Sequence, residues 1–270
     1  MPTWRLLVTP PAPGAWNMAV DEAIALMAAK GASRTTLRFY QWQPGAVSLG
    51  RHQPSADIDR KAVQERGYGL VRRPTGGRAI LHVDELTYSI AGSASDELLS
   101  GAVLDTYNRL SEGLVLGLRR LGLDAEKAPG TTRTGPDVSA ACFEVPSAYE
   151  LCVGPAKIMG SAQSRRAGYV LQHGSLPLRG DITRLVDVLV VSDESERASL
   201  SATLASRATT VEKALGRQVT FWEAATLLID GLSSALGVDF YEGELSAGEV
   251  ELAQKLEAET YGNPVWLDRL

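Results

Sequence analysis

The segment of residues 103–123 constrains the fold most, because it predicts one long amphipathic helix between two groups of strand-like runs. Its apolar side chains recur at helical spacing and share one stripe, which contains Val103, Tyr107, Leu110, Leu114 and Leu118. A helix of this kind buries one face against another element, so the neighbouring strands are expected to form a sheet that it covers.

Before this helix, the chain alternates strand-like runs with two further helical segments. They are expected at residues 4–10 (strand), 17–31 (helix ending at Gly31), 57–67 (short polar helix) and 68–93 (strand, tight turn, strand and further strand). Two aromatic or β-branched runs around Gln43-Pro44-Gly45 predict a hairpin over residues 36–53.

After the helix, a polar loop at residues 124–137 leads into three strand-like runs over residues 142–178. These runs are broken at Gly154-Pro155 and Ala167-Gly168, which predicts a three-strand meander. The chain beyond them is mainly helical, and two of its helices begin with capping-box sequences, Thr220-x-x-Glu223 and Ser246-x-x-Glu249. The order of elements predicts a mixed α/β (α+β) fold with a largely antiparallel central sheet and flanking helices.

Composition argues against several classes of protein. Hydrophobic residues make up 44% of the 270 residues and charged residues 22%, which supports a sizeable core and argues against wholesale disorder. The net charge of -5 argues against a general nucleic-acid binder, which needs a basic surface to neutralise phosphates. The sequence shows no secretory signal pattern and no apolar run near the ~18 residues of a membrane span. We therefore expect a cytoplasmic protein whose thiols stay reduced.

The segment RRPTGGRAILH, residues 72–82, is the first candidate for a binding element. Gly76-Gly77 allows positive φ and the close approach of a ligand, and successive backbone N–H groups in such a turn can hold an anion or a polarised carbonyl. Arg72 and Arg73 would face opposite sides of a strand, so that one of them could reach a ligand. The alternative is an ordinary Gly-Gly hairpin with solvated arginines.

The three histidines give little support for a metal site. His52, His82 and His173 form no H-x-x-x-H or H-E-x-x-H pattern. No G-x-S-x-G sequence occurs either, so a serine hydrolase is unsupported.

Cys142 and Cys152 could form a disulfide, belong to a metal clip, pack in the core, or include a nucleophile. A reducing compartment argues against the disulfide, and the absence of a matching histidine cluster in the sequence argues against zinc. Cys152 lies in an apolar strand-like run and is typical of sheet packing. Cys142 lies where a loop meets a strand, which is a common place for reactive side chains.

Lys157 suggests a partner for Cys142. It follows the Gly154-Pro155 turn, and a hairpin there could bring the two side chains into one cleft. A nearby cation lowers the pKa of a thiol from its ordinary value of about 8.5 and so favours the reactive thiolate. On these residues alone, the alternative remains that Lys157 is an edge lysine and Cys142 a buried cysteine.

Taken in order, the segments RRPTGGRAILH, CFEVPSAYEL, KIMGSAQSRR and LQHGS resemble the biotin/lipoate protein ligase and acyltransferase family. WNMAVDEA and RFYQWQPGAVSLGRHQ resemble the opening of the same family, so the similarity covers most of residues 4–180. The chain follows the family's cysteine-type octanoyl-[acyl-carrier-protein]–protein N-octanoyltransferase pattern at Cys142, Phe143, Pro146, Ser147 and Gln163. It departs from the wider family pattern at Arg78, where a third glycine is usual, and at Val83, where an acidic residue is common.

The resemblance implies a biotin/lipoate ligase-like catalytic fold, with an acyltransferase core at residues 1–205 and a helical C-terminal region at residues 206–270 packed on it as one structural unit. It implies that Cys142 is the acyl-accepting nucleophile and that Lys157 is its electrostatic partner. The residues implied for the acyl pocket and carbonyl site are Arg73, Thr75, Gly76, Gly77, His82, Gly160, Ser161, Ala162 and His173. Cys152 has no role in this pattern.

The activity implied is the transfer of an octanoyl (or lipoyl) group from acyl carrier protein, through a cysteine acyl-enzyme, to a lysine of a lipoyl domain or of glycine-cleavage H protein. Nucleophilic catalysis suits such a transfer, and no ATP, cofactor or metal is expected. We expect a monomer without nucleic-acid or membrane partners. Arg72, Arg165 and Arg166 are candidates for docking an acidic carrier protein, with a solvated face as the alternative.

Three other functions remain open from the sequence. An ATP-dependent lipoate–protein ligase should tolerate loss of Cys142, and a lipoyl-domain amidotransferase should use acylated H protein as its donor. A non-catalytic acyl-binding protein comes from a different class, and the presence of both Cys142 and Lys157 argues against it.

Overall fold

The computed structural model describes residues 1–128 and 150–270, and one large sheet runs through them. Its strand order is β11-β1-β2-β6-β10-β9-β8-β7. The strands are β1 (Thr3–Val8), β2 (Thr36–Tyr40), β6 (Glu85–Ser93), β7 (Ala125–Lys127), β8 (Leu151–Val153), β9 (Ala156–Arg166), β10 (Tyr169–Pro177) and β11 (Asp239–Glu242). β1 pairs parallel with β2 and β11. In the rest of the sheet, each strand from β2 to β7 in the spatial order just given pairs antiparallel with the next. The predicted mixed fold with a largely antiparallel sheet is confirmed.

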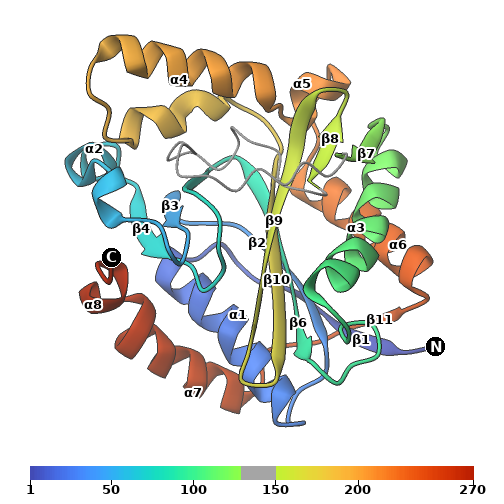
Figure 1. The fold of residues 1–270 in the computed structure, drawn as a ribbon. Helices are drawn as coiled ribbons and strands as arrows, with labels where there is room; N and C mark the ends of the chain where they lie inside the picture. Colours follow the sequence, from blue (N-terminus) through green and yellow to red (C-terminus); the bar gives the residue numbers. More distant parts are fainter. Residues whose placement is uncertain (129–149) are drawn as a thin grey trace.

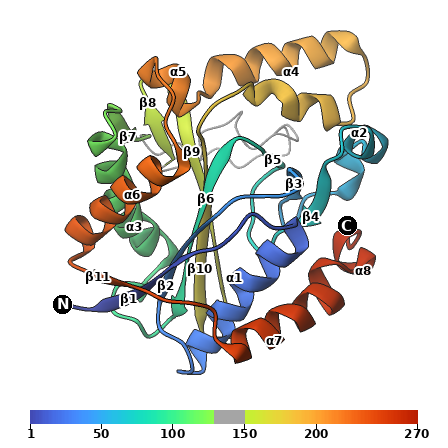
Figure 2. The ribbon, with the colours of Figure 1, turned by 180° about the vertical axis from the view of Figure 1, so that it is seen from behind.

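Helices cover both faces of this sheet (Figure 1, and from behind in Figure 2). α3 (Val103–Arg120) and α6 (Phe221–Leu236) pack together on one face, and α1 (Gly14–Ala29) and α7 (Ala247–Leu256) cover the other. The stripe predicted on α3 is buried at Leu110, Leu114 and Leu118, whereas Val103, the first residue of the helix, is 48% exposed. The large sheet therefore lies between two apolar cores, one on each face.

A small second sheet has the strand order β4-β3-β5, with β3 (Ala46–Leu49) between β4 (Gly69–Arg72) and β5 (Ile80–His82). The predicted hairpin over residues 36–53 is wrong, because β2 pairs with β1 and β6 on its two edges while β3 belongs to this second sheet. β4 and β5 do not pair with each other either, since both flank β3. Residues 73–79 therefore cross one end of β3 and do not form a simple Gly-Gly hairpin.

The remaining elements surround the small sheet or extend the tail. They are η1 (Ser55–Asp57), α2 (Arg60–Glu65), η2 (Ile182–Val188), α4 (Glu194–Arg207), α5 (Val211–Leu215), η3 (Glu257–Tyr261) and α8 (Pro264–Leu267). The meander of β8, β9 and β10 is confirmed in the described residues, whereas β7 and β11 form where a loop and helices were expected. Side chains of β11 are mostly exposed, so this strand shows no alternating apolar pattern.

Both predicted capping sequences begin helices, but they do so differently. Ser246 and Glu249 form the reciprocal capping box at the start of α7. Thr220 accepts a hydrogen bond from the backbone N–H of Glu223, while the Glu223 carboxylate pairs with Arg217 at 2.8 Å. In the part of the chain that the structure describes, no helix is both long and apolar enough to cross a membrane.

Gly231 allows α6 to pack directly against the backbone of α3. A Cβ at this position would lie 2.3 Å from Gly117 N and 2.5 Å from Gly113 O. Because both obstructing atoms are backbone, we expect Gly231→Ala to destabilise the protein by about 1–3 kcal/mol, measured as the free energy of unfolding in urea. Gly248→Ala in α7 is the matched control, since its nearest neighbour is the flexible end of Met27 at 3.2 Å. Equal stability of the two variants would contradict this interpretation.

Candidate active site

Several predicted site residues meet where the segment of residues 73–79 lies against β10. Thr75 Oγ1 and His173 Nε2 are 2.7 Å apart, and both side chains are buried. His173 lies opposite Ala162 in the β10–β9 ladder, and Ser161 and Gly160 occupy the next two positions along β9. The structure therefore brings residues from three separate sequence motifs to one place.

Asp21 of α1 lies behind His173, and the sequence analysis did not assign it a role. Its carboxylate accepts hydrogen bonds from Arg38 Nη1 at 2.7 Å, Ser89 Oγ at 2.7 Å and Tyr40 OH at 2.9 Å. Burial raises the pKa of Asp21, but the charge of Arg38, the nearby His173 ring and the hydrogen bond from Ser89 outweigh it and keep this pKa below its ordinary value. Asp21 is therefore a buried, ionised carboxylate.

The protonation state of His173 follows from its surroundings. Burial lowers its pKa, and this effect outweighs the opposing influence of the Asp21 carboxylate. His173 Nδ1 lies 3.8 Å from Asp21 Oδ2. We assign the neutral tautomer with its proton on Nδ1 facing Asp21, which leaves Nε2 to accept the hydroxyl hydrogen of Thr75.

The buried Arg73 side chain holds the segment of residues 73–79 by hydrogen bonds to backbone carbonyls. Its guanidinium donates to Gly76 O at 2.8 Å, Arg78 O at 2.7 Å and Ser48 O at 2.8 Å. Gly77 has φ of 92°, which favours glycine. A Cβ on the facing Gly50 would lie 1.8 Å from Gly77 O, so two chain segments approach each other as closely as backbones can.

Arg72 does not have the role expected of a solvated or carrier-docking arginine. It is fully buried, and its guanidinium donates to Gly50 O at 2.8 Å, Gln53 O at 2.6 Å and Leu267 O at 2.7 Å. Backbone carbonyls from two separate parts of the chain hold it, so the docking prediction is wrong for Arg72. Arg165 and Arg166 are partly exposed, and their docking role stays a prediction.

His82 is held on three sides. Its Nε2 lies 2.8 Å from Ser48 Oγ, its Nδ1 lies 2.8 Å from Glu85 Oε1, and its ring stacks on Trp42 with 4.0 Å between ring centroids. Because Ser48 Oγ also accepts from Arg73, a chain of hydrogen bonds links His82 to the segment of residues 73–79. Among the described residues, no three His, Cys, Asp or Glu side chains group as metal ligands.

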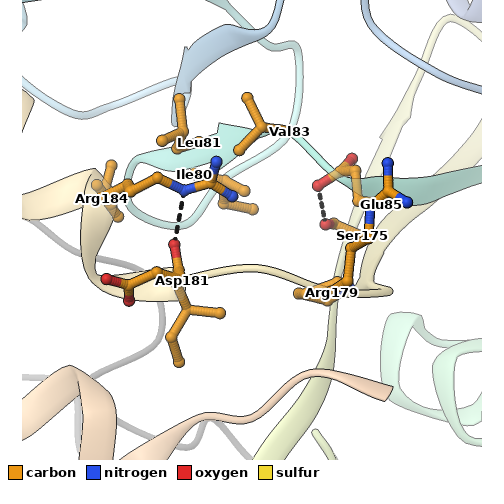
Figure 3. Close-up of a pocket in the computed structure, with 11 residues that line it drawn as sticks. Ile80, Leu81, Val83, Glu85, Ser175, Arg179, Asp181 and Arg184 are labelled. Atoms are coloured by element: carbon orange, nitrogen blue, oxygen red, sulfur yellow. Dashed lines mark hydrogen bonds between the residues drawn. The ribbon is translucent and has the colours of Figure 1, made fainter. Parts of the chain in front are cut away.

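A pocket adjoins the His82 network (Figure 3). Glu85 and Ser175 face each other across a hydrogen bond at one side, and Arg184 Nε donates to Asp181 O at the other. The pocket is lined by Ile80, Leu81, Val83, Glu85, Ser175, Pro177, Arg179, Asp181, Ile182, Arg184 and Leu185. None of the predicted site residues lines it directly, although Glu85 binds His82 and Ser175 pairs with Gly160.

Lys157 forms a second centre near the start of β9. Its side chain is 1% exposed, and Nζ lies 2.5 Å from Glu150 Oε1, whose side chain is 5% exposed. Lys157 is also the register partner of Cys152 on β8. Lys157 is therefore a buried cation and not the solvated edge lysine that the sequence left possible.

Cys152 is a buried free thiol in β8. Burial raises its pKa, the Glu150 carboxylate raises it further, and Lys157 opposes them only in part. The predicted packing role of Cys152 is confirmed, because its side chain is buried in β8. A thiol whose pKa is raised is also a poor nucleophile. Cys142, the predicted nucleophile, lies outside the described residues, as do Phe143, Pro146 and Ser147.

Comparison with known proteins gives the context of these two centres. Residues 13–233 match the lipoyl protein ligase A/B catalytic domain. The chain is 44% identical to octanoyltransferase LipM of Symbiobacterium thermophilum over 97% of both chains, and 40% identical to octanoyltransferase LipM of Carboxydothermus hydrogenoformans over 100% of both.

Solved structures of lipoate–protein ligases share the fold. A bi-partite lipoate protein ligase from Thermoplasma acidophilum, solved with its E2 lipoyl domain, gives a TM-score of 0.82 at 28% identity over 100% of this chain and 98% of that chain. A lipoate-protein ligase A bound with ATP gives 0.81 at 30% identity over 100% of both. The chain is therefore an acyltransferase and belongs to the lipoyl protein ligase A/B family.

Proposed function

We propose that this protein transfers an octanoyl group from acyl carrier protein to Cys142 and then to a lysine of a lipoyl domain or of glycine-cleavage H protein. The observation that carries the proposal is its similarity, over nearly the whole chain, to octanoyltransferases, together with the buried Lys157 ammonium. We also propose that residues 1–205 hold the catalytic groups and that residues 206–270 support them.

In the first step, the Cys142 thiolate attacks the carbonyl carbon of the carrier thioester. The carbon–sulfur bond to the carrier breaks, the carrier leaves as a thiolate that takes up a proton, and an acyl-enzyme remains. A buried ammonium such as that of Lys157 is well suited to stabilise the oxyanion of the tetrahedral intermediate, because water does not screen its charge. The acceptor amine then attacks the acyl-enzyme, and the amide forms as the cysteine thiolate leaves.

The group of side chains around Thr75 and His173 is proposed to position the acyl group. Thr75, His82 and His173 are buried, and each is fixed by a hydrogen bond to another element. Rigid side chains of this kind can shape an apolar site for the C8 chain, whose burial contributes about 0.8 kcal/mol per CH₂ group. Arg73 and the backbone N–H groups near Gly76 are proposed to complete the carbonyl site.

Acylation of the protein tests the proposal. The protein is incubated with octanoyl acyl carrier protein without ATP, and its intact mass and peptide masses are measured. One added octanoyl group on a peptide containing Cys142, and none on Cys142→Ser, is the expected result. An unchanged mass, or a label on Cys152, would overturn the proposal.

An ATP-dependent lipoate–protein ligase is the second candidate, because solved structures that share the fold include lipoate–protein ligases, one of them bound with ATP. Octanoyl carrier protein, octanoylated H protein, and free octanoate with and without ATP are each offered as donors to an apo lipoyl domain. Transfer from the carrier protein without ATP supports the octanoyltransferase. Transfer from free octanoate that requires ATP supports the ligase, and transfer from H protein alone supports an amidotransferase.

A further inference from the structure

One oxygen of the Glu150 carboxylate accepts a hydrogen bond, and the other has no hydrogen-bond partner among the described residues. Oε1 accepts a hydrogen bond from Lys157 Nζ, whereas Oε2 is buried and has no hydrogen-bond partner within residues 1–128 and 150–270. Burying a carboxylate oxygen without a donor is unfavourable, and buried polar groups nearly always have partners. A donor for Oε2 must therefore come from outside the described residues, and a bound ligand can supply it.

A hydrogen bond holds the backbone of Glu150, the residue directly before β8. Its carbonyl accepts from Ala128 N at 2.7 Å, and β8 bulges between Leu151 and Cys152 where it pairs with β9. Lys157 is fixed in turn, because its carbonyl accepts from Thr209 N at 2.9 Å. The carboxylate is therefore held in place beside the ammonium.

No other buried carboxylate in the described part of the chain has an unpaired oxygen. Each of them accepts hydrogen bonds from several donors: Asp21 from Arg38, Tyr40 and Ser89, Glu22 from Arg166, Tyr169 and Tyr261, Glu85 from His82, Thr87 and Ser175, and Glu249 from Arg5, Ser33 and Ser246. The unpaired oxygen beside Lys157 is thus a local property of the proposed catalytic centre.

We propose that Glu150 Oε2 receives the ammonium group of the acceptor lysine and removes one proton from it, an inference that rests on the proposed function. A protonated amine has no lone pair, so it cannot attack the acyl-enzyme until it loses that proton. The uncharged amine then forms the carbon–nitrogen bond, the carbon–sulfur bond breaks, and the second nitrogen proton passes to the departing cysteine thiolate. Glu150 returns its own proton to water, which restores the carboxylate.

The proposed base is needed in only one of the two half-reactions, the transfer from the acyl-enzyme to lysine. Acylation by the carrier thioester involves no ammonium and needs no such base, whereas transfer to lysine does. Hydroxylamine is uncharged near neutral pH and can attack the same acyl-enzyme without losing a proton first. A variant that lacks the base should therefore fail with lysine and succeed with hydroxylamine.

The experiment uses Glu150→Gln, which keeps the shape of the side chain and removes its basicity. Octanoylated enzyme is prepared with octanoyl carrier protein, and single-turnover deacylation is followed by intact mass with either an apo lipoyl domain or hydroxylamine. We expect the rate of transfer to the lipoyl domain, divided by the rate of deacylation by hydroxylamine, to fall by about a hundredfold or more, in the range of general-base catalysis.

Two further variants keep the result interpretable. Glu126→Gln changes an exposed carboxylate on the neighbouring strand β7 and should behave as wild type with both acceptors. Glu150→Asp retains the charge but shortens the side chain, so it should slow transfer to lysine selectively even where the Gln variant folds poorly. Equal slowing with both acceptors, or no slowing with lysine, would overturn the proposal. A wild-type protein that forms no acyl-enzyme would instead overturn the proposed function.

Discussion

Lys157→Met is expected to slow octanoyl transfer by about a hundredfold to a thousandfold, the usual cost of removing one donor from an oxyanion site. Lys157 is a buried cation paired with the Glu150 carboxylate, and methionine has a similar length but no charge. The rate of acyl-enzyme formation from octanoyl carrier protein, measured by intact mass, checks this expectation. Wild-type acylation by the variant would contradict it.

The same substitution should destabilise the fold, because it leaves the Glu150 carboxylate buried without its cation. Breaking a buried ion pair by removing one partner costs about 3–5 kcal/mol. The double variant Lys157→Met/Glu150→Gln removes both charges and should recover much of the lost free energy of unfolding while remaining inactive. This comparison separates lost catalysis from lost stability. A double variant no more stable than Lys157→Met would mean that the pair does not determine stability here.

Local patterns in the sequence were sufficient for the elements but not for the order of strands. The α3 stripe, the β8–β9–β10 meander and the α7 capping box are each encoded within a few turns or strands of chain. Each forms as predicted in the described residues, except that Val103 at the start of the stripe is exposed. The residue 36–53 hairpin failed because strand pairing is a property of the whole sheet. Both edges of β2 are occupied by β1 and β6, and nothing within residues 36–53 records that competition.

The candidate site shows the same limit. Thr75 and His173 are 98 positions apart and were linked only through family resemblance, whereas the structure joins them by a hydrogen bond. Asp21 carried a signal that could have been found, since it follows Met18 by three positions on the buried side of α1. Glu150 carried none, because one carboxylate in a loop-to-strand segment resembles any other until Lys157 is placed beside it.

Asp21→Asn is expected to lower the free energy of unfolding by about 3–5 kcal/mol, because it leaves the Arg38 guanidinium buried without a counter-charge. Both side chains are almost fully buried, and the substitution preserves the shape of Asp21. Asp230→Asn removes the aspartate of an exposed pair with Arg120 and is the matched control. It should have a far smaller effect, because solvent screens exposed pairs. Urea unfolding of both variants at neutral pH provides the measurement.

The pH dependence of this difference tests whether ionised Asp21 is the cause. The pKa of Asp21 in the folded protein lies below its ordinary value, which is about 3.9 in unfolded chains. Its ionisation therefore contributes stability that is fully present above about pH 4 and is lost as the pH falls through the folded pKa. Asparagine does not titrate, so the stability difference between the wild type and Asp21→Asn should begin to shrink below about pH 4 and should vanish below the folded pKa of Asp21. A difference that stays constant down to the acid unfolding of both proteins would show that the carboxylate charge does not stabilise Arg38.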